Sequence, residues 1–195
     1  LIQITEIDSQ VIFDNGPLKT GTTSLSGVTV PTSGYEWSEV AYDAPTITYS
    51  STTAGISGLV SSAFRLGDDF TIPSGETWII DSLTVYAYQT GYNGSTSPFT
   101  GLNVQLWNGY PNAMGSTLVF GDLVTNRLTS STEDFTYRIF NTIAPSPGTA
   151  TTTTRRIWKL NANITDQTLS SSTYWLVYQY TASAGFSPTV SLLNS

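Results

Sequence analysis

The chain of 195 residues contains no histidine and no cysteine. Without histidine it has no Ser-His-Asp or Cys-His nucleophile system and no histidine general base. Without cysteine it has no thiolate, iron–sulfur cluster, disulfide or cysteine-ligated zinc. Any catalysis would fall to carboxylates, tyrosines or the two lysines. We therefore predict a protein that is not an enzyme and that requires no cofactor.

Charged residues are also scarce, at 11% of the chain, and the 14 acidic residues outnumber the seven basic ones. The net charge of −7 argues against a surface that follows the phosphates of nucleic acid or anionic lipid, because such surfaces need Lys and Arg. We expect no nucleic-acid partner. We also expect no membrane span, because the chain lacks the run of about 18 apolar residues that a spanning helix needs.

Hydroxyl residues are abundant, with 25 Ser and 32 Thr, and aromatic residues make up 12% of the chain. The apolar content of 39% is too high for a disordered chain, and the length fits one domain over residues 1–195. This hydroxyl-rich, lysine-poor composition is typical of extracellular bacterial surfaces, so we predict a secreted or cell-surface location. No signal-peptide pattern follows Leu1, so we expect a removed signal peptide or an excised piece of a longer chain.

Apolar residues alternate with polar ones or form short runs, and turn formers recur about every ten residues, which predicts an all-β chain. The segment from Thr77 to Thr90 carries apolar side chains on both faces, as a strand in the middle of a sheet does. Further strands are expected at 10–13, 46–49, 69–72, 102–107, 117–121, 135–141, 156–160 and 173–181. This spacing favours a β-sandwich of two antiparallel sheets, with the less regular residues 1–60 packed on it.

One block of the sequence, Gly67 to Asp81 followed by Val85 to Gly91, resembles a group of secreted bacterial proteins. In that group, with many members from the Bacteroidota and many exported by type IX secretion, the block reads DDFTVPxGxxWxID and then VxxYAYQTG. The likeness extends to residues 14–17, 106–109, 111–112, 115, 119–122, 125–128 and 174–176.

The resemblance implies a jelly-roll-like sandwich of the kind found as an accessory domain on exported enzymes and adhesins, and it assigns no activity to any residue. Two features depart from the group. The stretch from Arg155 to Trp158 is more cationic than expected, and the chain stops at Ser195, before the further strand and sorting tail that such proteins usually have.

The candidate ligand-binding set consists of five aromatic residues: Tyr86, Tyr88, Tyr92, Trp107 and Tyr110. Side by side, their flat rings would stack on sugar faces while their polar tips formed hydrogen bonds. The amides of Asn103, Gln105 and Asn108 would add polar contacts. The competing interpretation, which we favour, is that these rings fill the core or cover its edge.

The candidate calcium ligands are Asp68, Asp69, Asp122 and Asn126. Calcium takes six to eight oxygen ligands, and jelly-roll modules often hold such an ion, so a structural calcium is one hypothesis. The chain has no D-x-D-x-D-G loop. The alternative is that these aspartates accept backbone hydrogen bonds in turns.

Glu133 and Asp134 form an adjacent carboxylate pair, and paired carboxylates are what glycoside hydrolysis requires. Neighbours in a strand point to opposite faces, however, and the pair lies in a Ser/Thr-rich stretch that we interpret as a turn. A carboxylate-dependent glycosidase is therefore the least favoured function.

The leading prediction is a non-catalytic module for adhesion or surface recognition, with glycans as the first ligand class and a cell-surface partner as the wider one. The alternative is a structural subunit that forms a homo-oligomer, a surface layer, a fibre or a larger exported assembly. Sandwiches with few charges can pair through an edge strand. An incomplete last strand would favour exchange of strands between neighbouring chains, which would also build such an assembly.

Overall fold

The structure is a computed structural model that describes residues 2–5, 10–24, 27–40, 54–139, 153–183 and 188–189. Its strands are β1 (Ile2–Thr5), β2 (Val11–Asp14), β3 (Glu36–Ser38), β4 (Ile56–Ser57), β5 (Leu66–Thr71), β6 (Thr77–Tyr88), β7 (Phe99–Trp107), β8 (Leu118–Asp122), β9 (Leu128–Arg138), β10 (Arg156–Ser170), β11 (Thr173–Ala182) and β12 (Pro188–Thr189). A single turn of 3-10 helix, η1, covers Val60–Ser62. Within these residues no helix is long and apolar enough to cross a membrane.

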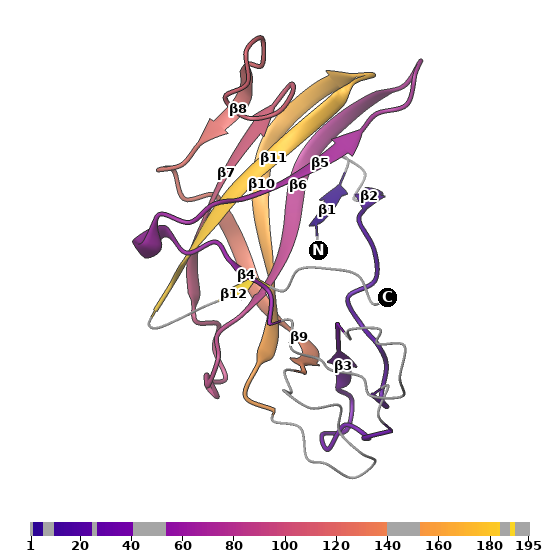
Figure 1. The fold of residues 1–195 in the computed structure, drawn as a ribbon, viewed down its shortest axis with the longest axis vertical. Helices are drawn as coiled ribbons and strands as arrows, with labels where there is room; N and C mark the ends of the chain where they lie inside the picture. Colours follow the sequence, from indigo (N-terminus) through magenta and orange to yellow (C-terminus); the bar gives the residue numbers. More distant parts are fainter. Residues whose placement is uncertain are drawn as a thin grey trace.

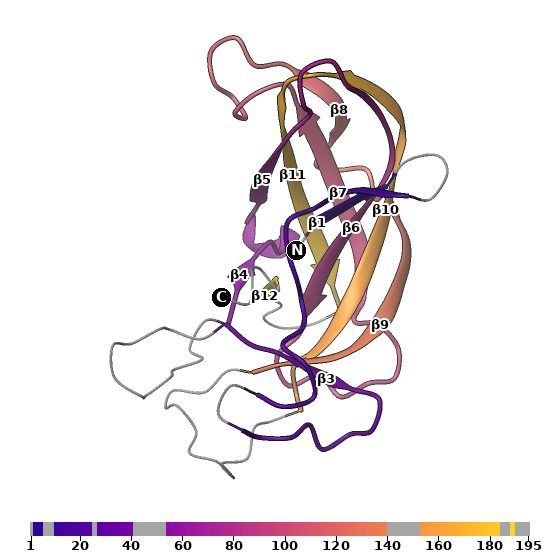
Figure 2. The ribbon, with the colours of Figure 1, turned by 90° about the vertical axis from the view of Figure 1, so that its right-hand side faces the viewer.

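The strands form two sheets that lie face to face (Figures 1 and 2). The large sheet follows the order β2-β1-β6-β10-β9-β3, with β12 and β4 attached beside β6, and it curls. The small sheet follows the order β5-β11-β7-β8 and is antiparallel throughout. The predicted all-β fold with two sheets is therefore confirmed.

One pairing differs from the antiparallel prediction: β3 lies parallel to β9, which makes the large sheet mixed. Parallel neighbours need a long connection rather than a hairpin, and β3 comes from residues far from β9 in the chain. Because β3 and β9 are joined by a long stretch of chain and not by a hairpin, they can lie parallel to each other.

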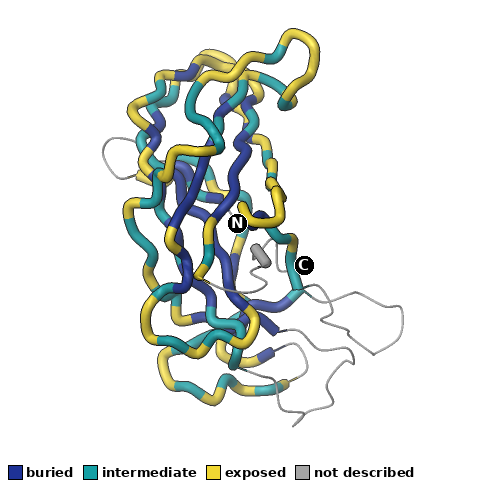
Figure 3. The backbone as a smooth tube through the Cα atoms, turned by 90° about the vertical axis from the view of Figure 1, so that its left-hand side faces the viewer, coloured by how far each residue is buried: buried dark blue, intermediate teal, exposed yellow. Residues whose placement is uncertain are grey.

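The main core lies between the sheets and is made of alternate residues of the long strands. From the small sheet, Leu102, Val104 and Leu106 are fully buried. From the large sheet, Leu83 and Val85 are fully buried opposite them. Figure 3 shows these buried stretches in dark blue along the middle of the strands, with the exposed residues concentrated in the loops.

Strand β6 lies between β1 and β10, which confirms the central position predicted for it. Strict alternation would place Ile80 and Leu83 on opposite faces, but both belong to the main core. The change of face coincides with a bulge in β10, where Asn163 pairs with Ser82 but Gln167 pairs with Ile80. Such a bulge bends the sheet and changes which side chains face inward.

Strands β9 and β10 extend well beyond their predicted bounds. The stretch around Glu133 and Asp134, interpreted as a turn from its Ser and Thr content, lies inside β9. Outward positions of a strand accept hydroxyl residues without cost to the core, so the composition is misleading there. The strand predicted at 46–49 lies outside the described residues.

The N-terminal region contributes to the core instead of only packing on a finished sandwich. Ile2 and Ile4 of β1 are buried in the main core. Leu18 forms a second buried cluster with Tyr86, Tyr88 and Ile157, on the outer side of the large sheet. Trp37 forms a third, with Tyr137 and Ile139. The described residues of 16–24 and 27–39 therefore cover part of the outer side of the large sheet.

Candidate functional site

The outer face of the small sheet carries aromatic and amide side chains. On β7, Gln105 and Trp107 alternate with the buried leucines and are half-buried. On β11, Trp175 alternates with Tyr174 and Leu176, which belong to the main core. The alternation of each strand thus directs one tryptophan of β7 and one of β11 away from the core.

Backbone pairing arranges these side chains in rows across the sheet. Trp175 lies between Asp69 of β5 and Trp107 of β7. In the next row, Val177 lies between Gly67 and Gln105. Because Gly67 has no side chain, nothing projects from the β5 side of the row formed by Gly67, Val177 and Gln105. A hollow of about 330 Å3 opens at this point.

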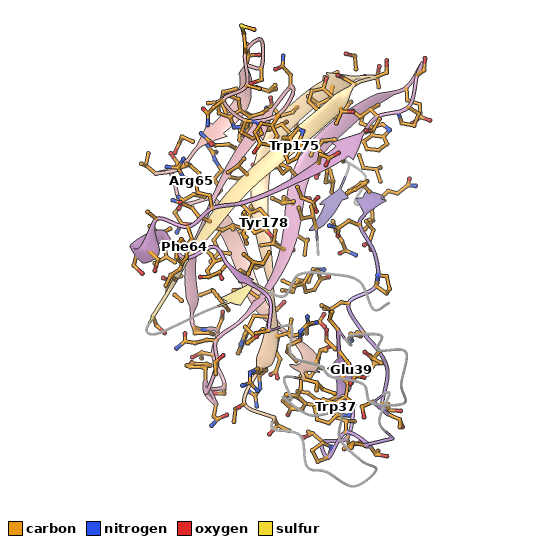
Figure 4. All side chains as sticks on the ribbon, viewed as in Figure 1. Trp37, Glu39, Phe64, Arg65, Trp175 and Tyr178 are labelled. Carbon is orange, nitrogen blue, oxygen red and sulfur yellow. The ribbon has the colours of Figure 1, made fainter. Side chains whose placement is uncertain are left out.

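We call this depression the Trp175 hollow. It is lined by Trp175, Val177, Gln105, Leu66, Gly67, Arg65 and the loop residues Tyr110, Pro111 and Asn112. Figure 4 labels Arg65 and Trp175 on the part of the small sheet that faces the viewer. The hollow combines aromatic surface, two amides and one cation in a single shallow site.

The rings at this hollow are held in a defined geometry. Tyr110 is 63% exposed and meets Trp175 edge to face, with ring centroids 4.9 Å apart and an interplanar angle of 75°. Trp107 donates its Nε1 hydrogen to Oε1 of Gln105 over 3.4 Å. The edge-to-face arrangement is one that aromatic pairs prefer, so Tyr110 is positioned even though it lies on a loop.

Hydrogen bonds also fix the loop that presents Tyr110. The backbone N–H of Asn108 donates to the carbonyl of Thr117, and the N–H of Thr117 donates to the side-chain oxygen of Asn108. Within the loop, the N–H of Ala113 donates to the carbonyl of Tyr110. Together these bonds close the loop as a compact turn beside the sheet.

A second hollow of about 470 Å3 lies on the same face, around Thr181, Gly101, Val124 and Asn126. Thr181 and Gly101 are paired across β11 and β7, two rows beyond Val177 and Gln105. The intervening row is filled because Gln179 donates to the carbonyl of Leu123 and Asn103 donates to that of Thr125. We call this second site the Thr181 hollow.

The structure does not bring the five predicted aromatic residues together. Tyr110 lines the Trp175 hollow and Trp107 is paired with Trp175 beside it, whereas Tyr86 and Tyr88 belong to the large sheet and are buried. Tyr92 is half-buried against the main core and donates its hydroxyl to the carbonyl of Thr96. The core interpretation therefore fits these three tyrosines.

The two buried tyrosines are anchored by the N-terminal half of the chain. The Tyr88 hydroxyl donates to the carbonyl of Ala54, and the Tyr86 hydroxyl donates to Oε1 of Gln3. Burial raises the pKa of each to about 12, and for Tyr86 the negative charge of Asp134 adds to the rise. Both phenols are neutral at physiological pH, as buried tyrosines should be.

The four predicted calcium ligands lie at opposite edges of the small sheet. Asp68 and Asp69 are in β5, whereas Asp122 ends β8, and Asn126 lies in the turn after it. They therefore do not form one ligand set. Within the described residues no group of three or more acidic side chains is arranged to hold a metal ion. Calcium binding by this chain stays a prediction.

Three of these four side chains, those of Asp68, Asp122 and Asn126, have structural partners. Asp68 accepts a hydrogen bond from the amide of Asn15. Asp122 accepts from the backbone N–H groups of Thr125 and Val124, and these bonds lower its pKa to about 2. Asn126 accepts from the N–H groups of Leu102 and Leu128. The turn interpretation describes these contacts.

Glu133 and Asp134 bind the N-terminal segment to β9. Glu133 lies 2.8 Å from Nε of Arg156 and accepts the hydroxyl hydrogen of Tyr35. Asp134 lies 3.7 Å from Nζ of Lys19 and accepts from the hydroxyl of Thr136. Both carboxylates are thus engaged in contacts that join residues 19–35 to the large sheet.

The sequence reasoning missed Trp175, Arg65 and Gly67. Alternation within the predicted strand at 173–181 already separates Trp175 from Tyr174 and Leu176, so its outward direction was readable. The pairing of Trp175 with Trp107 and with the β5 side of the hollow was not, because it depends on strand order.

Comparisons with protein-family models, with curated proteins and with solved structures find nothing that matches this chain.

Proposed function

We propose that this chain is a non-catalytic recognition module of a secreted or cell-surface protein, and that it binds glycans at the Trp175 hollow. The observation that carries the proposal is the ring pair of the exposed Tyr110 and the half-buried Trp175. This pair lines one shallow depression together with the half-buried amide of Gln105. Flat rings contact the apolar faces of sugars, and amides bind their hydroxyls.

The polar tips of the rings support the same proposal. Within the described residues, neither the Tyr110 hydroxyl nor the Trp175 indole N–H forms a hydrogen bond, whereas Tyr86, Tyr88 and Tyr92 each use their hydroxyl. Unused donors beside exposed rings are typical of a surface that meets a polar ligand.

A jelly-roll-like connectivity is part of this proposal. The resemblance implies it, and the nested pairing of β5 with β11 and of β6 with β10 supports it. In such a sandwich the outer face of one sheet is a natural site for an extended ligand. The spacing of the two hollows along β11 and β7 fits a chain of several sugar units.

A glycan array followed by calorimetry tests the proposal. We expect the wild-type chain to bind at least one class of polysaccharide. Trp175→Ala and Tyr110→Ala should each weaken binding at least tenfold, because each removes a ring at the hollow. Trp107→Ala should weaken it less, since Trp107 does not line the hollow itself.

Phe135→Ala is the matched control, because Phe135 is an exposed aromatic residue, 54% accessible, on β9 of the large sheet. It should leave binding unchanged. Absence of binding to every glycan, or equal losses for Phe135→Ala and Trp175→Ala, would contradict the proposal.

A second candidate function, assembly, is favoured by β8. Among the described strands, β8 pairs only with β7, so its other edge is unpaired there, and the strand carries the exposed Leu118 and Val119. An apolar strand edge is a template for pairing with another chain. Light scattering at high concentration tests this candidate: self-association that Val119→Lys abolishes would support it, and a strictly monomeric wild type would reject it.

A further inference from the structure

Arg65 is the cation at the Trp175 hollow. It precedes β5, is exposed, and lines the same depression as Trp175 and Tyr110. Among the described residues it forms no ion pair. Lys19, Arg127 and Arg156, by contrast, lie 3.0, 3.4 and 2.8 Å from carboxylate oxygens.

An unpaired arginine is conspicuous in this chain because acidic residues outnumber basic ones by two to one. No carboxylate lies within ion-pair distance of Arg65 in the described part of the chain. A guanidinium is planar and offers a fork of donors that matches a carboxylate in two parallel hydrogen bonds. The site therefore presents an unpaired guanidinium beside two aromatic rings.

We propose that the ligand of the Trp175 hollow is an acidic glycan, and that Arg65 binds the carboxylate of a uronate residue whose ring stacks on Trp175 and Tyr110. This inference rests on the proposed glycan-binding function and names its substrate class. The stacking surface, the amide of Gln105 and the guanidinium would then address the ring, the hydroxyls and the carboxylate of one sugar unit.

Asp69 gives the site a direction. It lies on the outer face of β5, two residues beyond Gly67 and paired with Trp175, so the carboxylate-binding end and an acidic end lie on opposite sides of Gly67. A carboxylate at the Arg65 end is attracted, and one at the Asp69 end is repelled. The net charge of −7 gives no long-range attraction for an acidic glycan, so recognition depends on local contact with Arg65.

The test compares matched ligands by calorimetry: oligogalacturonate and oligoalginate, each as the acidic form with ionised carboxylates and as the fully methyl-esterified form. Esterification removes the charge and keeps the sugar backbone. We expect at least one of the acids to bind at least tenfold more tightly than its ester. Arg65→Gln should abolish the preference for that acid over its ester, and Arg65→Lys should retain part of the preference.

The outcomes separate this inference from the proposed function. If neutral glycans bind, Trp175→Ala abolishes that binding and Arg65→Gln is silent, the acidic-ligand inference is wrong and the glycan-binding face stands. Binding of acid and ester with equal affinity overturns the inference in the same way. If no glycan of either kind binds the wild-type chain, both proposals fail. Because Arg65 is exposed, its substitution should leave the Tm unchanged. An unchanged Tm then verifies that each Arg65 variant is folded.

Discussion

Tyr88 on β6 and Trp175 on β11 both point away from the space between the sheets, but their surroundings are opposite. Tyr88 is fully buried beneath the N-terminal segment, in a cluster with Leu18. Trp175 stays half-buried at an open hollow, with Tyr110 against its edge. Outward aromatic residues thus belong either to an additional core or to a binding surface.

The difference is made by residues distant in sequence. The outer side of the large sheet is covered because residues 16–39 pass over it and because Glu133 and Asp134 bind Tyr35 and Lys19. The described residues contain no comparable segment over the Trp175 hollow. An aromatic pattern on a strand therefore predicts the direction of a ring but not whether other chain covers it.

The largest expected effect separates the two faces by stability. Tyr88→Ala should lower the free energy of unfolding by about 3–5 kcal/mol, the usual cost of truncating a buried aromatic side chain. Trp175→Ala should lower it by less than about 1 kcal/mol, because a partly exposed side chain loses fewer contacts. Urea unfolding at neutral pH measures both. Equal losses would contradict the distinction between a covered and an open face.

The next effect concerns the contacts that hold the cover in place. Glu133→Gln should lower the free energy of unfolding by about 1.5–3 kcal/mol, the range for hydrogen bonds to charged groups. It removes the charge that faces Arg156 and Tyr35. Ligand binding should be unchanged. A double-mutant cycle with Arg156→Gln tests the pair, and purely additive losses would show that the two residues do not interact.

A third prediction fills the open face. Gly67→Phe should weaken ligand binding at least tenfold, because its side chain would occupy the hollow. A Cβ at this position would lie no closer than 3.7 Å to any neighbour, so Gly67→Ala should fold normally and is the size control. Calorimetry and thermal unfolding are the readouts. Full affinity of a folded Gly67→Phe chain would place the ligand elsewhere.

The smallest effect is a pH dependence at the turn after β8. Two backbone N–H bonds lower the pKa of Asp122 to about 2 from its ordinary 3.8. A lowered pKa stabilises the folded state above about pH 4, and this contribution is lost as the pH falls toward 2. The stability difference between the wild type and Asp122→Asn should shrink over that range. A constant difference would mean that the carboxylate charge is not responsible.

Prediction from sequence succeeded where information is local. Alternation in β7 correctly separated Leu102, Val104 and Leu106 from Gln105 and Trp107, and two apolar faces correctly marked β6 as central. It failed where pairing matters, since the bulge opposite Ile80 and the parallel approach of β3 depend on partners far away in the chain.

The candidate site shows the same limit. Trp107 and Tyr110 are close in sequence, and both lie near Trp175: Trp107 is paired with it and the Tyr110 ring contacts it. Tyr86 and Tyr88 are tyrosines like Tyr110, but they lie in the large sheet. Arg65 and Gly67 reach the hollow only through the pairing of β5 with β11. Strand order, which the sequence does not specify, decides the composition of the site.

The most direct test of the glycan-binding face is an NMR titration that follows the indole N–H signals of the five tryptophans as a binding glycan is added. We predict that the Trp175 signal moves most and that the Trp107 signal, one strand away, moves less. The signals of Trp37 and Trp158, both buried, should stay in place. Shifts confined to tryptophans other than Trp175 and Trp107 would contradict the assignment of the outer face of the small sheet as the binding surface.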